Sequence, residues 1–411
     1  MSGNLGPMKM TGARIVGLVT ACVLGLGLSA PPTVHAEQGQ PTQKQSGAKP
    51  DSKVTARIDA SGIQEVATTA DGRFLVALKK DRLVRYRITP SKIRKVGSSG
   101  RVEPLNSDVR SEGLAVHPSG KFAYVGVGSG PQNKKKYAVL VLRIDRPTPK
   151  LVKKISIKDV HPGKGVNFRG MTMRPDGKRL YLTVGKDLAT FKMGNGARGK
   201  LQAVETGQLL EVGPGRVATP DGTKLITGVR KKVSRDFLRY RIWDISGTGA
   251  PVPGPEQRID TTAFDVKGVG RLARIVPAPG NTTAFVHFYG WDHGSKDYVV
   301  KIDLATGEIL VFLGADEAVG APSTMSSLLG RSPSGDRIYV SDLGSQQEPP
   351  PITQRALARS DAGLATYERL KGRFALERVF AVSPAGKTKG LVYTVTIDKK
   401  DHSMQLVSIR N

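Results

Sequence analysis

The chain has 411 residues, of which 38% are hydrophobic and 24% are charged, a composition that supports a folded core and argues against a disordered chain. Lysine and arginine outnumber aspartate and glutamate by 63 to 35, so the formal net charge of +28 favours polyanionic partners such as cell-wall polymers, acidic polysaccharides, nucleic acid or anionic lipid. The single cysteine, Cys22, excludes an internal disulfide and a thiolate metal site.

Residues 1–36 have the features of a secretory signal peptide. Lys9 and Arg14 supply positive charge, residues 15–28 form a nearly unbroken apolar run, and Val34-His35-Ala36 ends in small residues at a signal-peptidase spacing. The apolar run is shorter than the about 20 residues of a transmembrane helix. We therefore expect a secreted or cell-wall-associated protein with no transmembrane segment in the mature chain.

Two further features complete the N-terminal region. Val19-Thr20-Ala21-Cys22 resembles the lipobox of bacterial lipoproteins, but an apolar run continues after Cys22, so a lipoprotein anchored at Cys22 is the minor alternative. Residues 37–52 are polar, contain proline and glycine and lack apolar periodicity, which predicts a disordered linker.

From residue 53 onward the chain repeats one unit seven times. In each copy two short apolar runs flank a tight turn, as in AVHPSGKFAYVGV, and this pattern predicts a β-hairpin. A third apolar run follows each hairpin, and often a fourth, more polar one. The turn glycines are spaced by 45 to 58 residues, which indicates an array of one supersecondary unit: Gly72, Gly120, Gly177, Gly222, Gly280, Gly335 and Gly386.

Four short antiparallel strands per unit predict an all-β fold, a seven-bladed β-propeller over residues 53–411. The seventh unit lacks its outer strand, whereas Val54–Ile58 has no place in the first unit. We expect this N-terminal strand to pair into the last blade and close the ring without an open edge. Gln346–Pro351 interrupts the sixth unit, and the strands of residues 346–370 stay unassigned.

The repeats resemble the YVTN-type propeller family, in which a Pro-Asp-Gly turn precedes a Leu-Tyr-Val strand and a later strand ends in Ile-Asp. Pro175-Asp176-Gly177 with Leu180-Tyr181-Leu182 matches the first feature, and Ile144-Asp145 matches the second. Trp243-Asp244 is similar to the ending of a Trp-Asp repeat. The resemblance covers nearly all of residues 54–411 and implies the fold, but such propellers include both binding proteins and enzymes.

One group of similar propellers comprises lactonases, and the strand end at residues 340–344 is similar to theirs. Glu112-Gly113 is similar to the Glu-Gly of metal-dependent gluconolactonases, but Arg169 stands where that group has asparagine. A cation there repels a metal, so we expect neither metal nor cofactor. The resemblance implies a lactonase-like hydrolase at the channel mouth as an alternative function. No catalytic residue is assigned, and its candidates are Glu112, Asp342 and His293.

The central channel is the first candidate site. Aligning the turns gives the residue at the head of each inner strand: Gln64, Glu112, Arg169, Pro214, Leu272, Ser327 and Arg378. Two arginines and a carboxylate at a channel mouth suit an anionic or polyol ligand, because the guanidinium fork binds in two places. A structural Glu–Arg pair that fills the channel is the alternative.

The loops between second and third strands are the second candidate. A propeller brings these loops to one face, where their cations form one basic surface that attracts polyanions and weakens with salt: Lys79, Lys80, Arg82, Lys134, Lys135, Lys136, Arg230, Lys231, Lys232, Arg235, Lys399 and Lys400. General solvation of a basic chain is the alternative. The fifth such loop contains Trp291, close in sequence to His293. An exposed tryptophan there could stack on a sugar ring or a base, and the alternative is that it covers the edge of the blade.

The leading hypothesis is an exported, monomeric propeller that binds an anionic extracellular ligand or polymer, with nucleic acid less favoured. Whether the protein is an enzyme stays open, and the ligand is not named by the sequence. The expected ligand-binding residues are Gln64, Glu112, Arg169, Arg378, Lys134, Lys135, Lys136, Arg230, Lys231, Lys232, Arg235 and Trp291.

Overall fold

The structure is a computed structural model that describes much of the chain from residue 53 onward. All of this lies in the second of two units, Ala48–Asn411, so the expected signal peptide and linker, with Cys22, lie outside the described residues. The described ranges are 53–79, 81–102, 113–129, 136–157, 168–184, 187–193, 201–204, 212–229, 237–261, 269–290, 296–313, 325–333, 337–343, 352–357, 364–369, 380–397 and 404–410.

The described residues form seven antiparallel sheets of four strands each, which confirms the all-β prediction. Blades one to three, each from its first to its fourth strand, are β2 (Ile63–Thr68), β3 (Phe74–Lys79), β4 (Arg82–Thr89) and β5 (Lys92–Ser98); β6 (Leu114–Val116), β7 (Phe122–Ser129), β8 (Lys136–Arg143) and β9 (Lys150–Ser156); β10 (Phe168–Met173), β11 (Arg179–Val184), β12 (Asp187–Met193) and β13 (Leu201–Val204).

Blades four to seven repeat the same order. They are β14 (Val212–Ala218), β15 (Lys224–Val229), β16 (Phe237–Asp244) and β17 (Val252–Asp260); β18 (Val269–Pro277), β19 (Thr283–Gly290), β20 (Lys296–Asp303) and β21 (Ile309–Leu313); β22 (Met325–Arg331), β23 (Arg337–Leu343), β24 (Ile352–Leu357) and β25 (Leu364–Arg369); β26 (Phe380–Val382), β27 (Val392–Ile397), β28 (Met404–Arg410) and β1 (Lys53–Asp59). The sixth blade thus has its last two strands inside the stretch that the sequence left unassigned.

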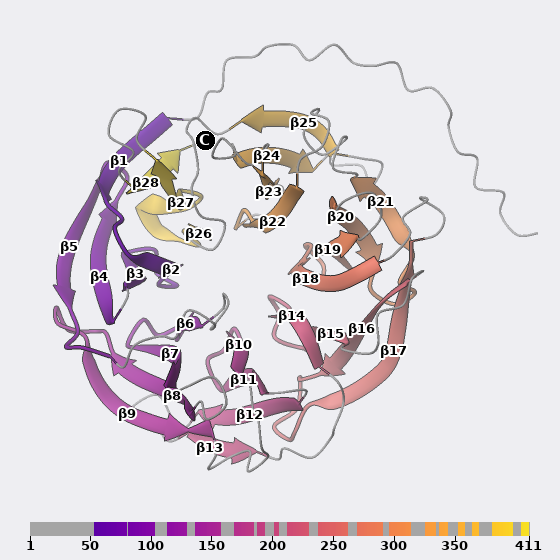
Figure 1. Cartoon of the computed structure of the whole chain (residues 1–411), viewed down its shortest axis with the longest axis horizontal. Helices are drawn as coiled ribbons and strands as arrows, with labels where there is room; N and C mark the ends of the chain where they lie inside the picture. Colours follow the sequence, from indigo (N-terminus) through magenta and orange to yellow (C-terminus); the bar gives the residue numbers. More distant parts are fainter. Residues whose placement is uncertain are drawn as a thin grey trace, which may run out of the picture. The chain divides into compact units, whose positions relative to one another are not determined.

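The first strand of each blade contacts the first strand of the next, and β26 contacts β2, so the seven sheets form a closed ring (Figure 1). This is a β-propeller. Among the described residues no α-helix occurs, and one short 3-10 helix, η4 (Gly386–Thr388), lies in the last blade. No helix of this part is long and apolar enough to cross a membrane.

The ring closes as the sequence predicts, through the N-terminal strand. β1 pairs antiparallel with β28, from Lys53 opposite Arg410 to Asp59 opposite Gln405, and becomes the outer strand of the last blade. The Thr55 and Ser408 hydroxyls lie 2.7 Å apart across this pair. The first and last segments of the propeller therefore stabilise each other, and neither leaves an open edge.

The repeated turn is a type I turn followed by a left-handed residue. In blade one the amide of Gly72 donates to the carbonyl of Thr69 (2.9 Å), and the amide of Thr69 donates to Phe74 (2.9 Å). Gly72 has φ +66°, which glycine adopts without steric cost. The preceding aspartate, Asp71, accepts hydrogen bonds from the Arg73 amide and the Thr69 hydroxyl, which explains the Asp-Gly sequence.

Blade five departs from the predicted alignment by one residue. There the amide of Asn281 donates to Ala278 (3.3 Å), and Asn281 has φ 57°. Asn281, and not Gly280, therefore stands at the place of the turn glycine. Asparagine is among the residues that tolerate this conformation. The residues that precede this turn shift with it, so Leu272 was wrongly placed at the channel mouth; its side chain is buried.

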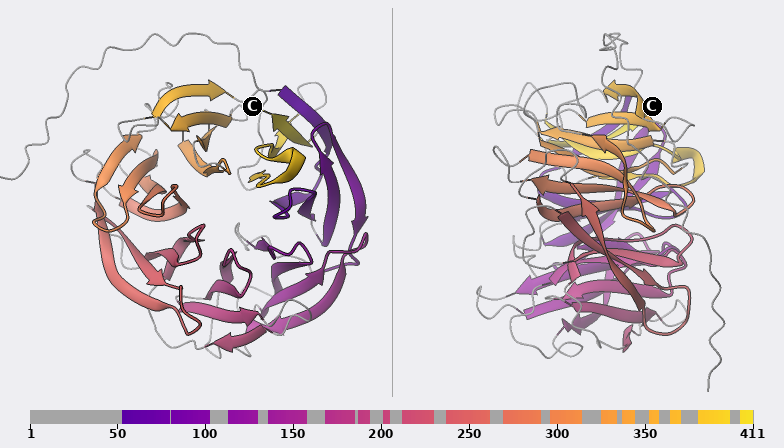
Figure 2. Two further views of the ribbon diagram at one scale, coloured as in Figure 1. Left: turned by 180° about the vertical axis from the view of Figure 1, so that it is seen from behind. Right: turned by 90° about the vertical axis from the view of Figure 1, so that its right-hand side faces the viewer.

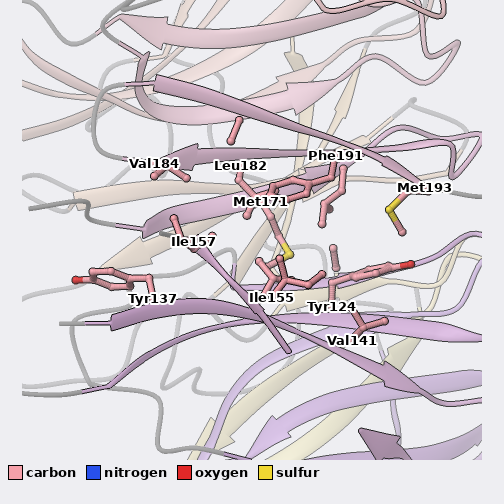
Figure 3. Close-up of a cluster of buried hydrophobic side chains, with 14 of the residues drawn as sticks. Tyr124, Tyr137, Val141, Ile155, Ile157, Met171, Leu182, Val184, Phe191 and Met193 are labelled. Carbon is pink, nitrogen blue, oxygen red and sulfur yellow. The ribbon is translucent and has the colours of Figure 1, made fainter. Parts of the chain in front are cut away.

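The core lies between neighbouring blades and is made by the faces of their sheets. Figure 3 shows the interface between blades two and three, where Tyr124 packs with Met171, Leu182 and Phe191. Tyr124 lies opposite Ala115 of its inner strand, and Tyr181, Tyr339 and Tyr393 lie opposite Thr172, Gly330 and Ala381. A small residue near the narrow centre of the ring paired with a large aromatic one further out suits wedge-shaped blades.

Candidate functional site

The heads of the inner strands and the connections between second and third strands lie at the same end of the ring. Every blade is antiparallel, so its strands alternate in direction between the two ends, as the side view shows (Figure 2). We call this the mouth end. The repeated turns and the connections between third and fourth strands lie at the other end, which we call the turn end. The strand ends that bound the two predicted sites therefore lie at the same end of the ring.

The inner strands carry β-bulges at the mouth. The register with the second strand shifts between Ile63 and Glu65 in β2 and between Phe168 and Gly170 in β10, so Gln64 and Arg169 occupy the bulges. In β14 the shift falls within residues 213–215, and in β18 one shift falls at Ala273. A bulge releases one residue from the ladder and re-aims its side chain, a device common beside functional sites.

The inner strands differ in charge near the mouth, at the position seven residues before the left-handed turn residue. Blades one and five carry Glu65 and Arg274 there, whereas Gly170 and Gly215 occupy it in blades three and four, Gly215 within the bulge. A Cβ on Gly215 would lie 3.6 Å from the backbone of Ala273, which is ordinary contact, so the φ of +77° and not close packing favours glycine here. In blade order, the carboxylate of blade one and the guanidinium of blade five thus lie on either side of these two glycine positions.

Glu65 links blades one and two at the mouth. Its Oε2 accepts a hydrogen bond of 2.9 Å from the amide of Gly113, the residue that follows Glu112. Glu65 was not among the predicted site residues, although a carboxylate within the short apolar strand Ile63–Thr68 is a signal that the sequence contains.

Two more arginines lie on inner strands. Arg216 of β14 is 5% exposed and is directly opposite Thr227. Arg331 ends β22 and is half-buried, and burial lowers the pKa of its guanidinium. With Arg274, the described inner strands therefore carry more arginine than carboxylate, so their electrostatics favour an anionic ligand.

The structure describes few of the predicted site residues. Gln64 is exposed at its bulge, and Arg169, Lys136 and Asp342 are placed by their backbones in β10, β8 and β23. Asp342 pairs with Ser326 near the mouth end of blade six. The remaining predicted residues lie outside the described residues: Glu112, Arg378, Lys134, Lys135, Arg230, Lys231, Lys232, Arg235, Trp291 and His293.

In blade one, acidic residues offset part of the positive charge around the connection between β3 and β4. Lys79 lies 3.4 Å from Asp59, while Arg82 and Arg101 lie 3.1 and 3.3 Å from Asp81. The hydrogen bond from Arg82 lowers the pKa of Asp81, so this carboxylate stays charged. Two acids thus partly neutralise three cations here, and these exposed pairs are weak.

In the described ranges, no group of three or more histidine, cysteine, aspartate or glutamate side chains is arranged to hold a metal ion.

Comparison with known proteins bears on the fold alone. No protein-family model matches the chain, and no curated protein sequence matches it significantly. The β-propeller domain of Cps50 (Swd1) from Myceliophthora thermophila matches over 87% of this chain and 99% of its own, with a TM-score of 0.54 and 11% identity. The periplasmic gluconolactonase PpgL of Pseudomonas aeruginosa matches over 74% and 84%, with a TM-score of 0.52 and 14% identity.

A third structure, a putative 6-phosphogluconolactonase from Bacteroides uniformis, matches over 79% of this chain and 90% of its own, with a TM-score of 0.50 and 14% identity. The chain is therefore a β-propeller with structural likeness to both Trp-Asp-repeat-type and lactonase-like propellers. Identities this low carry no activity from these proteins to this chain.

Proposed function

We propose that this protein is an exported propeller that binds an anionic extracellular ligand or polymer at its mouth end. The observation that carries the proposal is topological. The strand ends that flank four lysine- and arginine-rich connections, β3–β4, β7–β8, β15–β16 and β27–β28, lie at the same end as the bulged inner strands. This common end supports a single basic surface made of charges that are scattered in the sequence.

Chromatography of residues 37–411 on immobilised wall teichoic acid, heparin and DNA tests this proposal. The Lys134/Lys135/Lys136→Ala variant should elute at clearly lower salt than the wild type, because each lysine contributes an ion contact that salt screens. The matched control removes three exposed lysines of the turn end, Lys121, Lys178 and Lys192. Equal shifts in both variants would mean that the net charge, and not the mouth end, binds the polymer.

A lactonase-like hydrolase is the second candidate. It is supported by the likeness to two propellers named as gluconolactonases and by the Glu65–Gly113 hydrogen bond, in which a carboxylate accepts from the residue that follows Glu112 in the sequence. A screen of sugar lactones with Glu112→Gln as the comparison tests it. Hydrolysis by the wild type that is lost in Glu112→Gln and kept in the triple lysine variant would favour this candidate over binding alone.

A further inference from the structure

A second basic site lies at the turn end, on the outer strands of blade one. Arg87 of β4 is directly opposite Phe74 of β3 on one side and Arg94 of β5 on the other. Directly opposed residues project from the same face of a sheet, with Cβ atoms about 5 Å apart. Phe74, Arg87 and Arg94 therefore form one row across three strands, and both arginines are exposed.

Two like charges directly opposite one another destabilise a sheet. The carboxylates of Asp145 and Asp71 pair with other residues and not with Arg87 or Arg94. Asp145 accepts two hydrogen bonds from Arg143, of 2.7 and 3.0 Å, and Asp71 accepts from Thr69 and the Arg73 amide. Within the described ranges, neither Arg87 nor Arg94 forms an ion pair.

A third guanidinium belongs to the same face. Arg85 is two residues before Arg87 on β4, is 6% exposed, and lies 3.5 Å from the centroid of the Phe74 ring. Its Nη1 donates to the carbonyl of Arg146 (2.9 Å), while its Nε is buried without an acceptor in the described structure. Burial lowers the pKa of Arg85, whereas the charges of Asp145 and Asp71 act to raise it.

The connection between the third and fourth strands of blade two borders this face. A Cβ on Gly97 of β5 would lie 2.4 Å from the Pro147 carbonyl, so β5 and this connection are in contact. The exposed Arg146 precedes Pro147 and is bonded through its carbonyl to Arg85. Three arginines on one face of blade one, Arg85, Arg87 and Arg94, are thus bordered by Arg146 of blade two.

We propose that Arg87 and Arg94, with Arg146 at the border, bind a tetrahedral oxyanion, the phosphate or sulfate group of a ligand. Each guanidinium presents parallel donors that match two oxygens of such a group. An oxyanion between the opposed arginines offsets their repulsion, which the described residues leave uncompensated. This site is at the other end of the ring from the mouth and does not depend on the function proposed for it.

Calorimetric titration of residues 37–411 with inorganic phosphate and with sulfate at constant ionic strength tests the site, with acetate as the planar control. We expect saturable binding of at least one tetrahedral anion, at least tenfold weaker in Arg87→Gln/Arg94→Gln. Arg87→Lys/Arg94→Lys keeps the charge but loses the fork, and should bind at least threefold more weakly than the wild type. Acetate should bind at least tenfold more weakly than the preferred anion.

The matched control is Lys178→Gln/Lys192→Gln, which removes two exposed cations of the same end and should stay within twofold of the wild type. Folding is followed separately: without phosphate or sulfate, the double arginine variant should melt at or above the wild-type temperature, because the repulsion is gone. The absence of saturable binding, or an equal loss in the control, would overturn the proposal. So would loss of binding in the Lys134/Lys135/Lys136→Ala variant alone, since the anion would then bind at the mouth end.

Discussion

Closure of the ring between the seventh and first blades can be tested with two glycines in the same conformation. Gly72 and Gly120 both have φ +66° in equivalent turns of blades one and two. A Cβ on Gly72 would lie 2.0 Å from the Ala385 carbonyl oxygen of the last blade. A Cβ on Gly120 would meet Thr69 Cγ2 at 3.7 Å, which is ordinary contact. The two positions therefore differ in space and not in backbone conformation.

The expected costs follow from this difference. Alanine in the left-handed region costs about 1–2 kcal/mol, and this is the whole expected effect of Gly120→Ala. Gly72→Ala carries the same cost and also pushes the backbone of the last blade away, at about 1–3 kcal/mol. The shift further weakens the 2.5 Å hydrogen bond from the Thr388 hydroxyl to the Gly72 carbonyl, for about 1 kcal/mol more. We expect Gly72→Ala to be less stable than Gly120→Ala by about 2–4 kcal/mol.

Equilibrium unfolding in urea measures both variants against the wild type, with the midpoint interpreted only where the slope is unchanged. Agreement of the two variants within about 1 kcal/mol would refute this reasoning, because the last blade would then not pack on Gly72 as described.

Two other predictions concern buried polar groups. Tyr181→Phe should stabilise the protein by about 1 kcal/mol, because the Tyr181 hydroxyl is buried without a partner in the described structure. Tyr240→Phe should cost about 1 kcal/mol, because the Tyr240 hydroxyl donates to the carbonyls of Asp303 and Leu304. Thermal melting measures both variants, and a Tyr240→Phe variant more stable than Tyr181→Phe would contradict this reasoning. Burial lowers the pKa of His117 in the folded protein. As the pH decreases, the imidazole is therefore protonated in the unfolded chain before it is protonated in the folded protein. The contribution of His117 to the free energy of unfolding is complete above about pH 6.5 and is lost progressively below it. His117→Gln should therefore lose less stability than the wild type between pH 7.5 and 5.5, and equal losses would exclude the histidine as a cause.

The hydrogen bond from the Ser119 amide to His117 agrees with this sign, whereas the bond with the Gly177 carbonyl acts to raise the pKa of the histidine. Its Nδ1 accepts from the Ser119 amide at 3.1 Å, so Nε2 carries the proton and donates to the Gly177 carbonyl at 3.1 Å. A second proton on Nδ1 would remove the acceptor that the Ser119 amide uses. The neutral imidazole is thus the form that the packing of blades two and three selects.

The repeat could be predicted from the sequence because each turn requires a left-handed residue at a fixed place, as at Gly72 and Gly177. The pairing of the N-terminal strand followed from counting strands in the last unit. The alignment of blade five was wrong by one residue because Gly280 and Asn281 both adopt positive φ. Glycine and asparagine both tolerate this conformation, so the sequence alone does not determine which of them occupies the turn position.

The candidate sites were less predictable. Gln64 and Arg169 were predicted as ligand-binding residues from their place at the heads of inner strands, and this stays a prediction. That both residues occupy bulges depends on register, which a one-residue shift in pairing changes. The sequence did not predict that Arg87 lies opposite Arg94 for the same reason, because the sequences of β4 and β5 alone do not determine the register between them. Glu65 was missed because its partner, the Gly113 amide, lies 48 residues away in the next blade.

The most direct test of the central claim is lysine footprinting of residues 37–411 with and without heparin. The mouth end should become protected from acetylation, as measured by mass spectrometry, at Lys134, Lys135, Lys136, Lys231 and Lys232. Lys121, Lys178 and Lys192 of the turn end are exposed and should react equally in both conditions. Uniform protection of both sets, or protection of the turn end alone, would contradict the assignment of polymer binding to the mouth end.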